Sequence, residues 1–453
     1  MRRPVSPRSA ADSFPVTIER IGAEGDGVAT SPDGERLYLP LTLPGEEVRV
    51  DPATHGPAIL HPSPDRITPP CPHFGACGGC TLQHWRDGAY AAWKSDLLCD
   101  ALRRAGYADP PIAPLAHAAP GQRRRMDFAA HRTSHGVSLG LHARVTSAVK
   151  RGRAAEQVEP RSGSTGRVRV LQSAPVVDLS ECLVLHPALF SLAAPLRTIL
   201  SRLNGFRREA SVVANLLDHG PDLLLRTDAA PDRADRERLI GFARDHHLVR
   251  ISWATGRSEP EPILILQPPR ITLSGVPVDL PPGGFLQATA AGEAAIIDAV
   301  LAGLPPLPAR ARIAELYAGS GTLTFALAQR ARVIAWEGDT AAAASLRGAA
   351  NRAGLASRVE VTQRDLARQP VSAAELPGFA AAVLDPPFAG AFAQTAQVAG
   401  AKIPRVIYVS CNPAVLARDA RLLREAGYQL LAATPVDQFL WSARLESVCI
   451  FSR

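Results

Sequence analysis

The sequence has few aromatic residues and no long apolar run. The lack of such a run argues against a membrane-spanning protein. Aromatic residues make up 5% of the 453 positions, beside 46% hydrophobic and 21% charged residues, which is an ordinary globular balance. No stretch of about 18 apolar residues occurs, so we expect no membrane-spanning helix and no membrane partner. The stretch MRRPVSPRSAADSF is basic but lacks an apolar core, so we expect a cytoplasmic protein without a secretory signal.

Lysine is nearly absent, because the chain contains only Lys94, Lys150 and Lys402. The net charge of +7 and the pI of about 9.3 therefore come almost entirely from arginine. Arginine side chains pair with phosphate and stack on bases, which favours a polyanionic partner. A GC-rich genome that prefers arginine codons would give the same composition.

The length predicts about three domains, and the pattern along the chain divides it accordingly into an α/β protein. Residues 9–66 hold short strands separated by turns, including a hairpin turn at Asp33-Gly34, and predict a small OB-like β-barrel. Residues 67–282 predict a central α+β domain, within which the polar, arginine-rich stretch 150–168 predicts a flexible surface insertion. Residues 283–453 alternate strands and helices, which predicts a Rossmann-like parallel sheet. We expect a monomer.

Three of the seven cysteines lie close together, in CPHFGACGGCTLQHW. The spacing C-x5-C-x2-C formed by Cys71, Cys77 and Cys80 predicts a metal site, because thiols in a reducing compartment rarely gather without a ligand. Cys182 is the candidate fourth ligand. Zinc and an iron–sulfur cluster both accept four thiolates, and the spacing alone does not choose between them. A radical-type cluster uses three cysteines in a different spacing, so a closed structural site is favoured.

A glycine-containing turn between a strand and a helix, in ARIAELYAGSGTLTFALA, predicts a nucleotide-type site. Gly319 and Gly321 let the backbone approach a ligand, and Glu337 at the end of the next strand has the spacing of a ribose-binding acid. Asp365 follows the third strand and is placed to reach an adenine edge. The third glycine of a dinucleotide motif is missing, so S-adenosylmethionine fits better than a nicotinamide dinucleotide. A merely tight strand-to-helix turn is the alternative.

Two further strand ends carry reactive side chains. AAVLDPPFAG places Asp385 before two prolines, and VIYVSCNPAVLARD places Cys411 where Asn412-Pro413 stops the strand. ARLESVCIF holds Glu446 in an otherwise apolar strand, where a carboxylate is costly unless it is paired or functional. Alone, Cys411 would be explained as a core thiol and Glu446 as an edge-strand surface charge.

A thiol and a carboxylate together fit methylation at carbon 5 of a pyrimidine. That carbon is a poor nucleophile until a thiolate adds to carbon 6 and makes it enolate-like. After methyl transfer a base removes the carbon 5 proton and the thiol leaves.

On these motifs the sequence resembles the bacterial RNA uracil-5-methyltransferases that carry an N-terminal TRAM domain and an iron–sulfur cluster. The resemblance spans nearly the whole chain, and its most specific parts are CPHFGACGGCTLQH and VIYVSCNPAVLARD. It implies an S-adenosylmethionine-dependent methyltransferase acting on RNA, mainly 23S ribosomal RNA. It also implies a 4Fe-4S cluster and a TRAM-like barrel that binds RNA.

The resemblance also implies roles for single residues. Cys411 would be the nucleophile and Glu446 the base. The cofactor-binding residues would be Gln287, Tyr317, Gly319, Gly321, Glu337, Asp365 and Asp385. The cluster ligands would be Cys71, Cys77, Cys80 and Cys182.

Several positions depart from the family pattern. The family usually has Arg after D-P-P and Asp in the first strand, where this chain has Phe388 and Glu315. Near its C-terminus this chain has Arg444 where the family has a histidine. Because DPPF also resembles the D/N-P-P-Y/F motif, a methyltransferase acting on exocyclic amines is one alternative function. A non-catalytic RNA-binding protein is the other.

Overall fold

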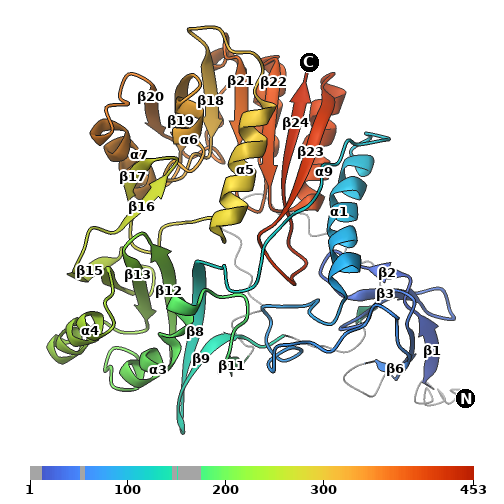
Figure 1. Cartoon of the computed structure of the whole chain (residues 1–453), viewed down its shortest axis with the longest axis vertical. Coiled ribbons are helices and arrows are strands. Elements are labelled where there is room, and N and C mark those ends of the chain that lie inside the picture. Colours follow the sequence, from blue (N-terminus) through green and yellow to red (C-terminus); the bar gives the residue numbers. More distant parts are fainter. Residues whose placement is uncertain (1–12, 52–56, 145–149, 152–174) are drawn as a thin grey trace, which may run out of the picture. The chain divides into compact units, whose positions relative to one another are not determined.

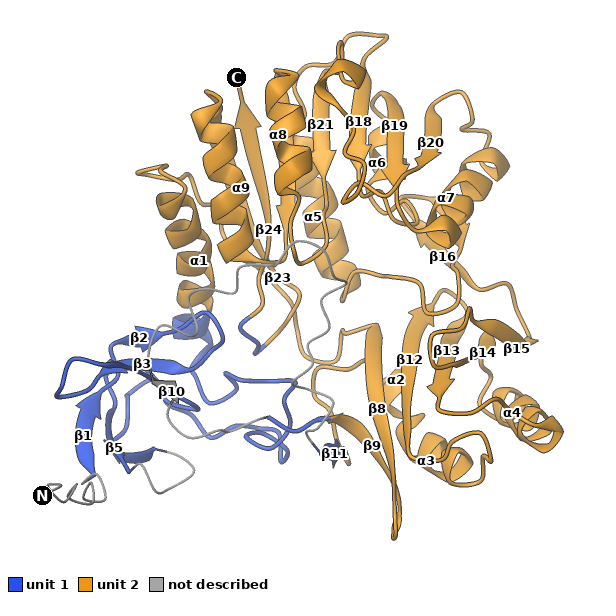
Figure 2. Ribbon diagram, turned by 180° about the vertical axis from the view of Figure 1, so that it is seen from behind, with its two compact units in different colours: residues 1–90, 142–177, 441–443 blue, residues 91–141, 178–440, 444–453 orange. Residues whose placement is uncertain are grey.

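The computed structural model describes residues 13–51, 57–144, 150–151 and 175–453. These residues group into two compact units, coloured separately in Figure 2. Unit 1 comprises residues 1–90, 142–177 and 441–443, and unit 2 comprises residues 91–141, 178–440 and 444–453. None of the helices in the described ranges is both long enough and apolar enough to cross a membrane. The division into domains at 9–66, 67–282 and 283–453 stays a prediction.

Unit 1 contains the short strands expected near the N-terminus. They form two small sheets of order β1-β5-β6 and β10-β4-β3-β2. The strands are β1 (Phe14–Thr17), β2 (Arg20–Ile21), β3 (Gly27–Thr30), β4 (Arg36–Leu39), β5 (Glu47–Val50), β6 (Ala58–His61) and β10 (Lys150–Arg151). The predicted hairpin is confirmed, since β3 and β4 pair antiparallel around Asp33-Gly34.

Both small sheets contribute side chains to one core, formed by Val16, Ile18, Ala29, Leu37, Leu39, Val48 and Val50. Closure of these sheets into a barrel stays a prediction. Of the predicted insertion at 150–168, Lys150 and Arg151 pair with β4 as a short strand, and the remaining residues lie outside the described part of the chain.

The middle of the chain forms a seven-stranded sheet of order β11-β9-β8-β12-β13-β14-β15. Its strands are β8 (Arg125–Thr133), β9 (Gly136–His142), β11 (Val176–Asp178), β12 (Glu209–Leu217), β13 (Gly220–Thr227), β14 (Arg250–Thr255) and β15 (Glu261–Ile265). Apolar side chains of the sheet pack with α2 (Pro187–Phe190), α3 (Ala193–Ser201) and α4 (Arg233–Asp245). The hairpin β16 (Arg270–Leu273) and β17 (Val276–Asp279) follows.

The C-terminal part forms an eight-stranded sheet of order β20-β19-β18-β21-β22-β24-β23-β7, visible in Figure 1. Its strands are β7 (Ala116–His117), β18 (Arg312–Leu316), β19 (Arg332–Glu337), β20 (Val359–Gln363), β21 (Ala381–Leu384), β22 (Arg405–Ser410), β23 (Gln429–Asp437) and β24 (Glu446–Ser452). Strands β18 to β22 are mutually parallel, and β24 inserts antiparallel between β22 and β23. The predicted Rossmann-like α/β sheet is confirmed.

Helices cover both faces of this sheet. On one face lie α5 (Ala290–Gly303), α6 (Thr324–Ala328) and α7 (Thr340–Arg352); on the other lie α1 (Asp87–Arg104), α8 (Phe392–Gly400) and α9 (Pro413–Glu425). Alternate residues of each strand serve the two cores. In β22, Ile407 belongs to the first core and Tyr408 to the second. Because the strand order reverses beside β18, ligands are expected at the carboxyl ends of β18 and its neighbours.

Candidate active site

The predicted site residues of unit 2 lie mostly at the carboxyl edge of the eight-stranded sheet. The parallel pairs Leu316–Trp336 and Leu384–Tyr408 align the ends of β18, β19, β21 and β22. Tyr317 and Asp385 each follow the last residue of a strand, and Cys411 follows β22. One edge therefore gathers the residues that the sequence placed in four separate motifs.

The two glycines of the turn after β18 have different tasks. Gly319 adopts φ +57°, and a Cβ built there meets no atom within 4 Å, so the backbone faces open space. A Cβ on Gly321 would lie 2.6 Å from side-chain atoms of Leu346 and Phe325, so this glycine allows close packing of the turn. Tyr317 also has a positive φ, of 67°, a strained conformation for an aromatic residue.

Glu337 and Asp365 both accept hydrogen bonds from the backbone. The carboxylate of Glu337 accepts from the Gly319 N–H at 2.7 Å and from the Asp339 N–H at 2.7 Å. Asp365 is exposed and accepts from the N–H groups of Ala367 and Arg368, at 3.0 and 3.2 Å. Glu337 is thereby fixed directly against the glycine turn, whereas Asp365 stabilises the turn that follows β20.

Glu315 differs from these two acids because it is buried in β18, with 2% of its surface exposed. Its Oε2 atom has no hydrogen-bond partner among the described residues. Burial, with the nearby charges of Asp385 and Glu337, raises the pKa of Glu315 to about 8. This side chain is therefore mostly protonated at neutral pH.

Cys411 lies between the end of β22 and the start of α9. Asn412 is the N-cap of that helix, and its Oδ1 accepts from the N–H groups of Ala414 and Val415, at 3.1 and 3.5 Å. Pro413 occupies the first helical turn, where its missing N–H costs nothing. The predicted stop at Asn412-Pro413 is confirmed, and it leaves the thiol partly exposed at a helix N-terminus.

The register of β22 against β24 brings Glu446 beside Cys411. Ser410 pairs with Ser447 at the last position of the ladder, and the Ser447 hydroxyl donates to the Ser410 carbonyl at 3.1 Å. Cys411 and Glu446 are the next residues on each side of that pair. Glu446 is the first residue of its strand rather than an interior one, and only 5% of its surface is exposed. It is not a surface charge.

The electrostatics of this pair disfavour charge on both groups. Burial, then the charges of Glu446 and Asp385, raise the pKa of Cys411 to about 12, while the Arg444 guanidinium acts in the opposite direction. Burial raises the pKa of Asp385 to about 7. Burial and the Asp385 charge raise the pKa of Glu446 well above its ordinary value. Desolvation therefore favours the neutral form of both carboxyl groups.

Gln438, which sequence reasoning missed, connects Glu446 to Gln287. Its Nε2 donates to Gln287 Oε1 at 2.7 Å and to Glu446 Oε2 at 3.0 Å, and its Oε1 accepts from the Ala288 N–H at 2.8 Å. All its amide groups are thus held by the protein. The available signal was a buried amide directly after a strand, in VDQFLW, but nothing local identified its partners.

Lys94 holds both ends of the connection between β23 and β24, and it too was missed. Its side chain is fully buried, and Nζ donates to Asp437 Oδ1 at 2.9 Å and to the carbonyl oxygen of Arg444. Asp437 ends β23, and Arg444 precedes Glu446 by two residues. A buried ammonium with two oxygen partners therefore fixes the segment that carries Gln438 and Glu446.

Two arginines of the run GQRRRMDF support the same region. Arg124 Nε donates to the carbonyl oxygen of Gln287 at 3.1 Å, and its Nη2 pairs with Glu293 at 2.5 Å. Arg125 donates to the carbonyl oxygens of Gly283 and Gly284, at 3.2 and 2.8 Å. These side chains bind protein oxygens and hold the segment that leads to Gln287.

The cysteine motif lies in turns of unit 1. The Cys77 N–H donates to the His73 carbonyl at 2.9 Å, and the Gly79 N–H donates to Cys77 Sγ at 3.4 Å. Cys182 belongs to unit 2 and packs at the edge of a hydrophobic core. Within the described ranges, no group of three or more His, Cys, Asp or Glu side chains is placed to hold a metal ion. The cluster site stays a prediction.

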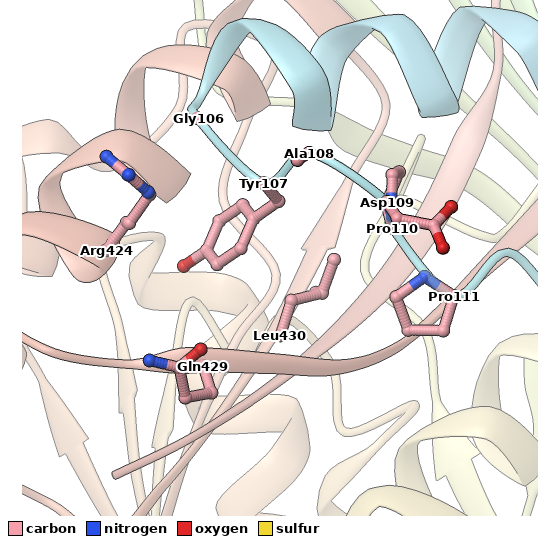
Figure 3. Close-up of a pocket in the computed structure, with 9 residues that line it drawn as sticks. All are labelled: Gly106, Tyr107, Ala108, Asp109, Pro110, Pro111, Arg424, Gln429 and Leu430. Atoms are coloured by element: carbon pink, nitrogen blue, oxygen red, sulfur yellow. The ribbon is translucent and has the colours of Figure 1, made fainter.

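A surface pocket of about 350 Å³ lies away from the carboxyl edge (Figure 3). It is lined by Gly106, Tyr107, Ala108, Asp109, Pro110, Pro111, Arg424, Gln429 and Leu430. Gln429 pairs with Ser452, whereas Cys411 adjoins the pair Ser410–Ser447 at the other end of β24. The pocket therefore contains none of the predicted site residues.

Comparison with known proteins finds relatives over most of the chain. The model of the tRNA (uracil-5-)-methyltransferase family matches residues 285–453. The chain is 38% identical to an uncharacterized RNA methyltransferase of Brucella melitensis, over 97% of each chain. It is 33% identical to the 23S rRNA (uracil(1939)-C(5))-methyltransferase of Chromohalobacter salexigens, over 98% of this chain and 90% of that one.

A solved structure resembles the fold over nearly the same length. The tRNA (uracil-54, C5)-methyltransferase of Pyrococcus abyssi, crystallised with S-adenosyl-L-homocysteine, superposes with a TM-score of 0.67 at 19% identity. The match covers 97% of this chain and 100% of that one. At this identity the likeness concerns the fold. The full-length relatives and the matching family model show that the chain is an RNA methyltransferase and belongs to the RNA uracil-5-methyltransferase family.

Proposed function

We propose that the protein transfers a methyl group from S-adenosylmethionine to carbon 5 of a uridine in RNA, with 23S ribosomal RNA as the substrate. The observation that carries the chemical part is the pairing of Cys411 with Glu446 beyond the last rung of the β22–β24 ladder. A methyltransferase acting on an exocyclic amine needs neither group, because the amine is itself the nucleophile. A thiol beside a desolvated carboxyl group supports carbon methylation.

The reaction divides between two side chains. Cys411 loses its thiol proton to water, and the thiolate sulfur forms a bond to carbon 6 of the uracil while the electron pair of the 5,6 double bond makes carbon 5 nucleophilic. S-adenosylmethionine supplies the methyl group. Glu446, in its ionised form, then takes the proton from carbon 5, the double bond re-forms and the carbon 6–sulfur bond breaks to release the thiolate. The raised pKa of Glu446 makes its ionised form a stronger proton acceptor than an exposed carboxylate.

The methyl donor would lie across the turn after β18. The open backbone at Gly319 would give room for it, and the Glu337 carboxylate beside that turn would accept hydrogen bonds from the ribose hydroxyls. Tyr317, Gln287 and Asp385 would surround the rest of the donor. Gly321 would act by packing the turn, and the exposed side chain of Asp365 would meet an adenine edge.

The RNA partner is supported by the relative that acts on 23S ribosomal RNA and by the basic charge of +7. The target uridine must leave its local stack to reach a thiol at the sheet edge. A TRAM-like barrel at residues 9–66 would contribute RNA binding. Because the substrate is ribosomal RNA, the enzyme would work in the cytoplasm, and we expect it to do so as a monomer.

We also propose that Cys71, Cys77, Cys80 and Cys182 bind a 4Fe-4S cluster. This rests on the C-x5-C-x2-C spacing and on the resemblance of the surrounding motif. No step of the reaction passes through it. Anaerobically purified protein should contain iron and acid-labile sulfide, and a Cys77→Ala variant should lose both; zinc in equal amount to protein would exclude the cluster.

Covalent trapping tests the reaction directly. With S-adenosylmethionine, RNA transcribed with 5-fluorouridine should stay bound to Cys411, because fluorine replaces the proton that Glu446 removes. A Cys411→Ala variant that methylates RNA at the normal rate would refute the proposal. Mapping of 5-methyluridine in ribosomal and transfer RNA from a deletion strain identifies the substrate, and loss only from transfer RNA would contradict the assignment to 23S ribosomal RNA.

A further inference from the structure

Phe388 is an exposed aromatic side chain directly after Asp385-Pro386-Pro387. Its exposed fraction is 49%, which makes it one of the few large apolar side chains so exposed in the described part of the chain. A single exposed apolar residue needs no explanation. Phe388 stands out because it lies on a loop that is held still beside the proposed nucleophile.

The loop that carries Phe388 is fixed by α9. Asn412 Nδ2 donates to the carbonyl oxygen of Phe388 at 3.2 Å, and Arg418 Nη2 donates to that of Ala389 at 3.2 Å. The Ala391 N–H donates to Asp419 Oδ2 at 2.9 Å. Since Asn412 adjoins Cys411, the backbone at Phe388 has a fixed place relative to the thiol. A ring presented by such a loop is ordered before any ligand binds.

Arg444 lies over the ring of Phe388, with its Cζ atom 4.2 Å from the ring centroid. Its backbone is anchored, because its carbonyl oxygen accepts from Lys94 and the next residue, Leu445, is fully buried. The guanidinium also lowers the pKa of Cys411, which places its charge within electrostatic reach of the thiol. Two anchored groups, one aromatic and one cationic, thus stack together at the rim of the site.

The two partners are also two of the positions where the sequence departs from the pattern it resembles. They are 56 positions apart, and no local pattern connects the two changes. The structure makes them one contact. An arginine and an aromatic ring are the two side-chain types on which unstacked bases commonly stack.

We propose that the Phe388–Arg444 pair is a stacking site for a nucleobase of the RNA, next to the uridine held at Cys411. The base would stack on an outer face of the Phe388–Arg444 pair, and the positive charge would also attract the adjoining phosphate. This inference rests on the proposed function, since it assumes that RNA enters this edge of the sheet.

Equilibrium binding of a short fluorescein-labelled single-stranded oligouridylate tests the pair without requiring turnover. Phe388→Ala should weaken binding by about 5- to 150-fold, the range for loss of one base stack, and Phe388→Trp should restore it. Arg444→Gln should weaken binding and reduce the salt slope by about 0.7. Arg444→Lys should keep the salt slope and lose affinity, because an ammonium does not stack.

The matched control is Leu431→Ala on β23. Leu431 is 47% exposed, and it lies toward the end of its strand that is remote from Cys411. Its affinity for the oligouridylate should equal that of the wild type. The rate of Cys411 alkylation by iodoacetamide should be the same in Phe388→Ala and wild type, which verifies that the site is intact.

The outcomes separate this inference from the proposed function. If the wild type fails to trap 5-fluorouridine RNA, the proposed function fails. If the wild type traps it, while Phe388→Ala binds oligouridylate as tightly as Leu431→Ala does, the stacking site is refuted and the proposed function stands. Loss of affinity in Phe388→Ala that Phe388→Trp does not restore also refutes stacking.

Discussion

The two halves of the carboxyl sheet edge hold their acids in different surroundings. On the β18–β20 half, Glu337 accepts two backbone hydrogen bonds of 2.7 Å, and Asp365 lies exposed in a turn. On the β21–β24 half, Glu446 is 5% exposed, accepts a hydrogen bond from the Gln438 amide, and has a pKa raised by burial. Backbone N–H groups fix the position of Glu337, whereas desolvation favours the neutral form of Glu446.

This difference separates binding from chemistry on one edge. A carboxylate whose position is fixed by backbone N–H groups is suited to accept hydrogen bonds from hydroxyl groups. A desolvated carboxyl group is suited to exchange a proton near neutral pH. The boundary falls beside β18, where the strand order reverses, and the buried Glu315 lies at that boundary with a pKa of about 8.

Removing the thiol should have the largest effect on the chemical half. Cys411→Ala should reduce turnover by about 10⁴-fold or more and abolish the adduct with 5-fluorouridine RNA, while S-adenosylmethionine binding stays intact. Single-turnover methylation and mass spectrometry measure both. Cys99→Ala on α1 is the matched control and should keep wild-type rates; full activity in Cys411→Ala would remove the distinction between the halves.

Replacing the proposed base, Glu446, should block the reaction after methyl transfer, at removal of the carbon 5 proton. Glu446→Gln should lower turnover by about 10²- to 10⁴-fold, the usual contribution of a general base. Because addition and methyl transfer precede proton removal, a methylated covalent adduct should accumulate with ordinary uridine RNA. Denaturing gels would detect it. A variant that forms no adduct at all would show that Glu446 acts before methyl transfer.

An equivalent change on the binding half should affect affinity instead. Glu337→Gln should weaken S-adenosylmethionine binding by about 10- to 100-fold, the loss expected for hydrogen bonds to a charged group. The rate at saturating donor should change little. Titration calorimetry measures the affinity for S-adenosylmethionine. The rate of Cys411 alkylation is the control and should stay unchanged. A fall in rate with unchanged affinity would contradict the division.

The smallest expected effect is on the melting temperature and its dependence on pH. The folded-state pKa of Glu446 is raised above its unfolded value of about 4.5, so its contribution is fully favourable below that pH and is lost as the pH rises through the folded value. Glu446→Gln should therefore melt a few degrees higher than wild type at pH 8 and at nearly the same temperature at pH 4. Ser447→Ala should show no such pH-dependent difference. Thermal denaturation at both pH values measures it.

The elements of the C-terminal sheet were predictable because strand and helix periodicity is local, and parallel strands put their ends at one edge. The placement of Cys411, Asp385 and Glu337 at the carboxyl edge of the sheet was predicted from that rule. Gln438, Lys94 and the Phe388–Arg444 contact were not, because their partners lie far away in sequence; Lys94 and Asp437 are 343 positions apart. Burial of Glu446 also required the register of β24, which an apolar pattern leaves undetermined.

Lys94 lies on α1, a helix that carries none of the proposed catalytic residues, yet substitution of Lys94 is expected to impair methylation. Lys94 binds both ends of the segment that carries the proposed base, so a substitution of Lys94 should alter where that base lies. Screens for loss of methylation should therefore recover variants in this helix beside those at Cys411. Such variants would behave as catalytic defects although the altered residue never meets the RNA.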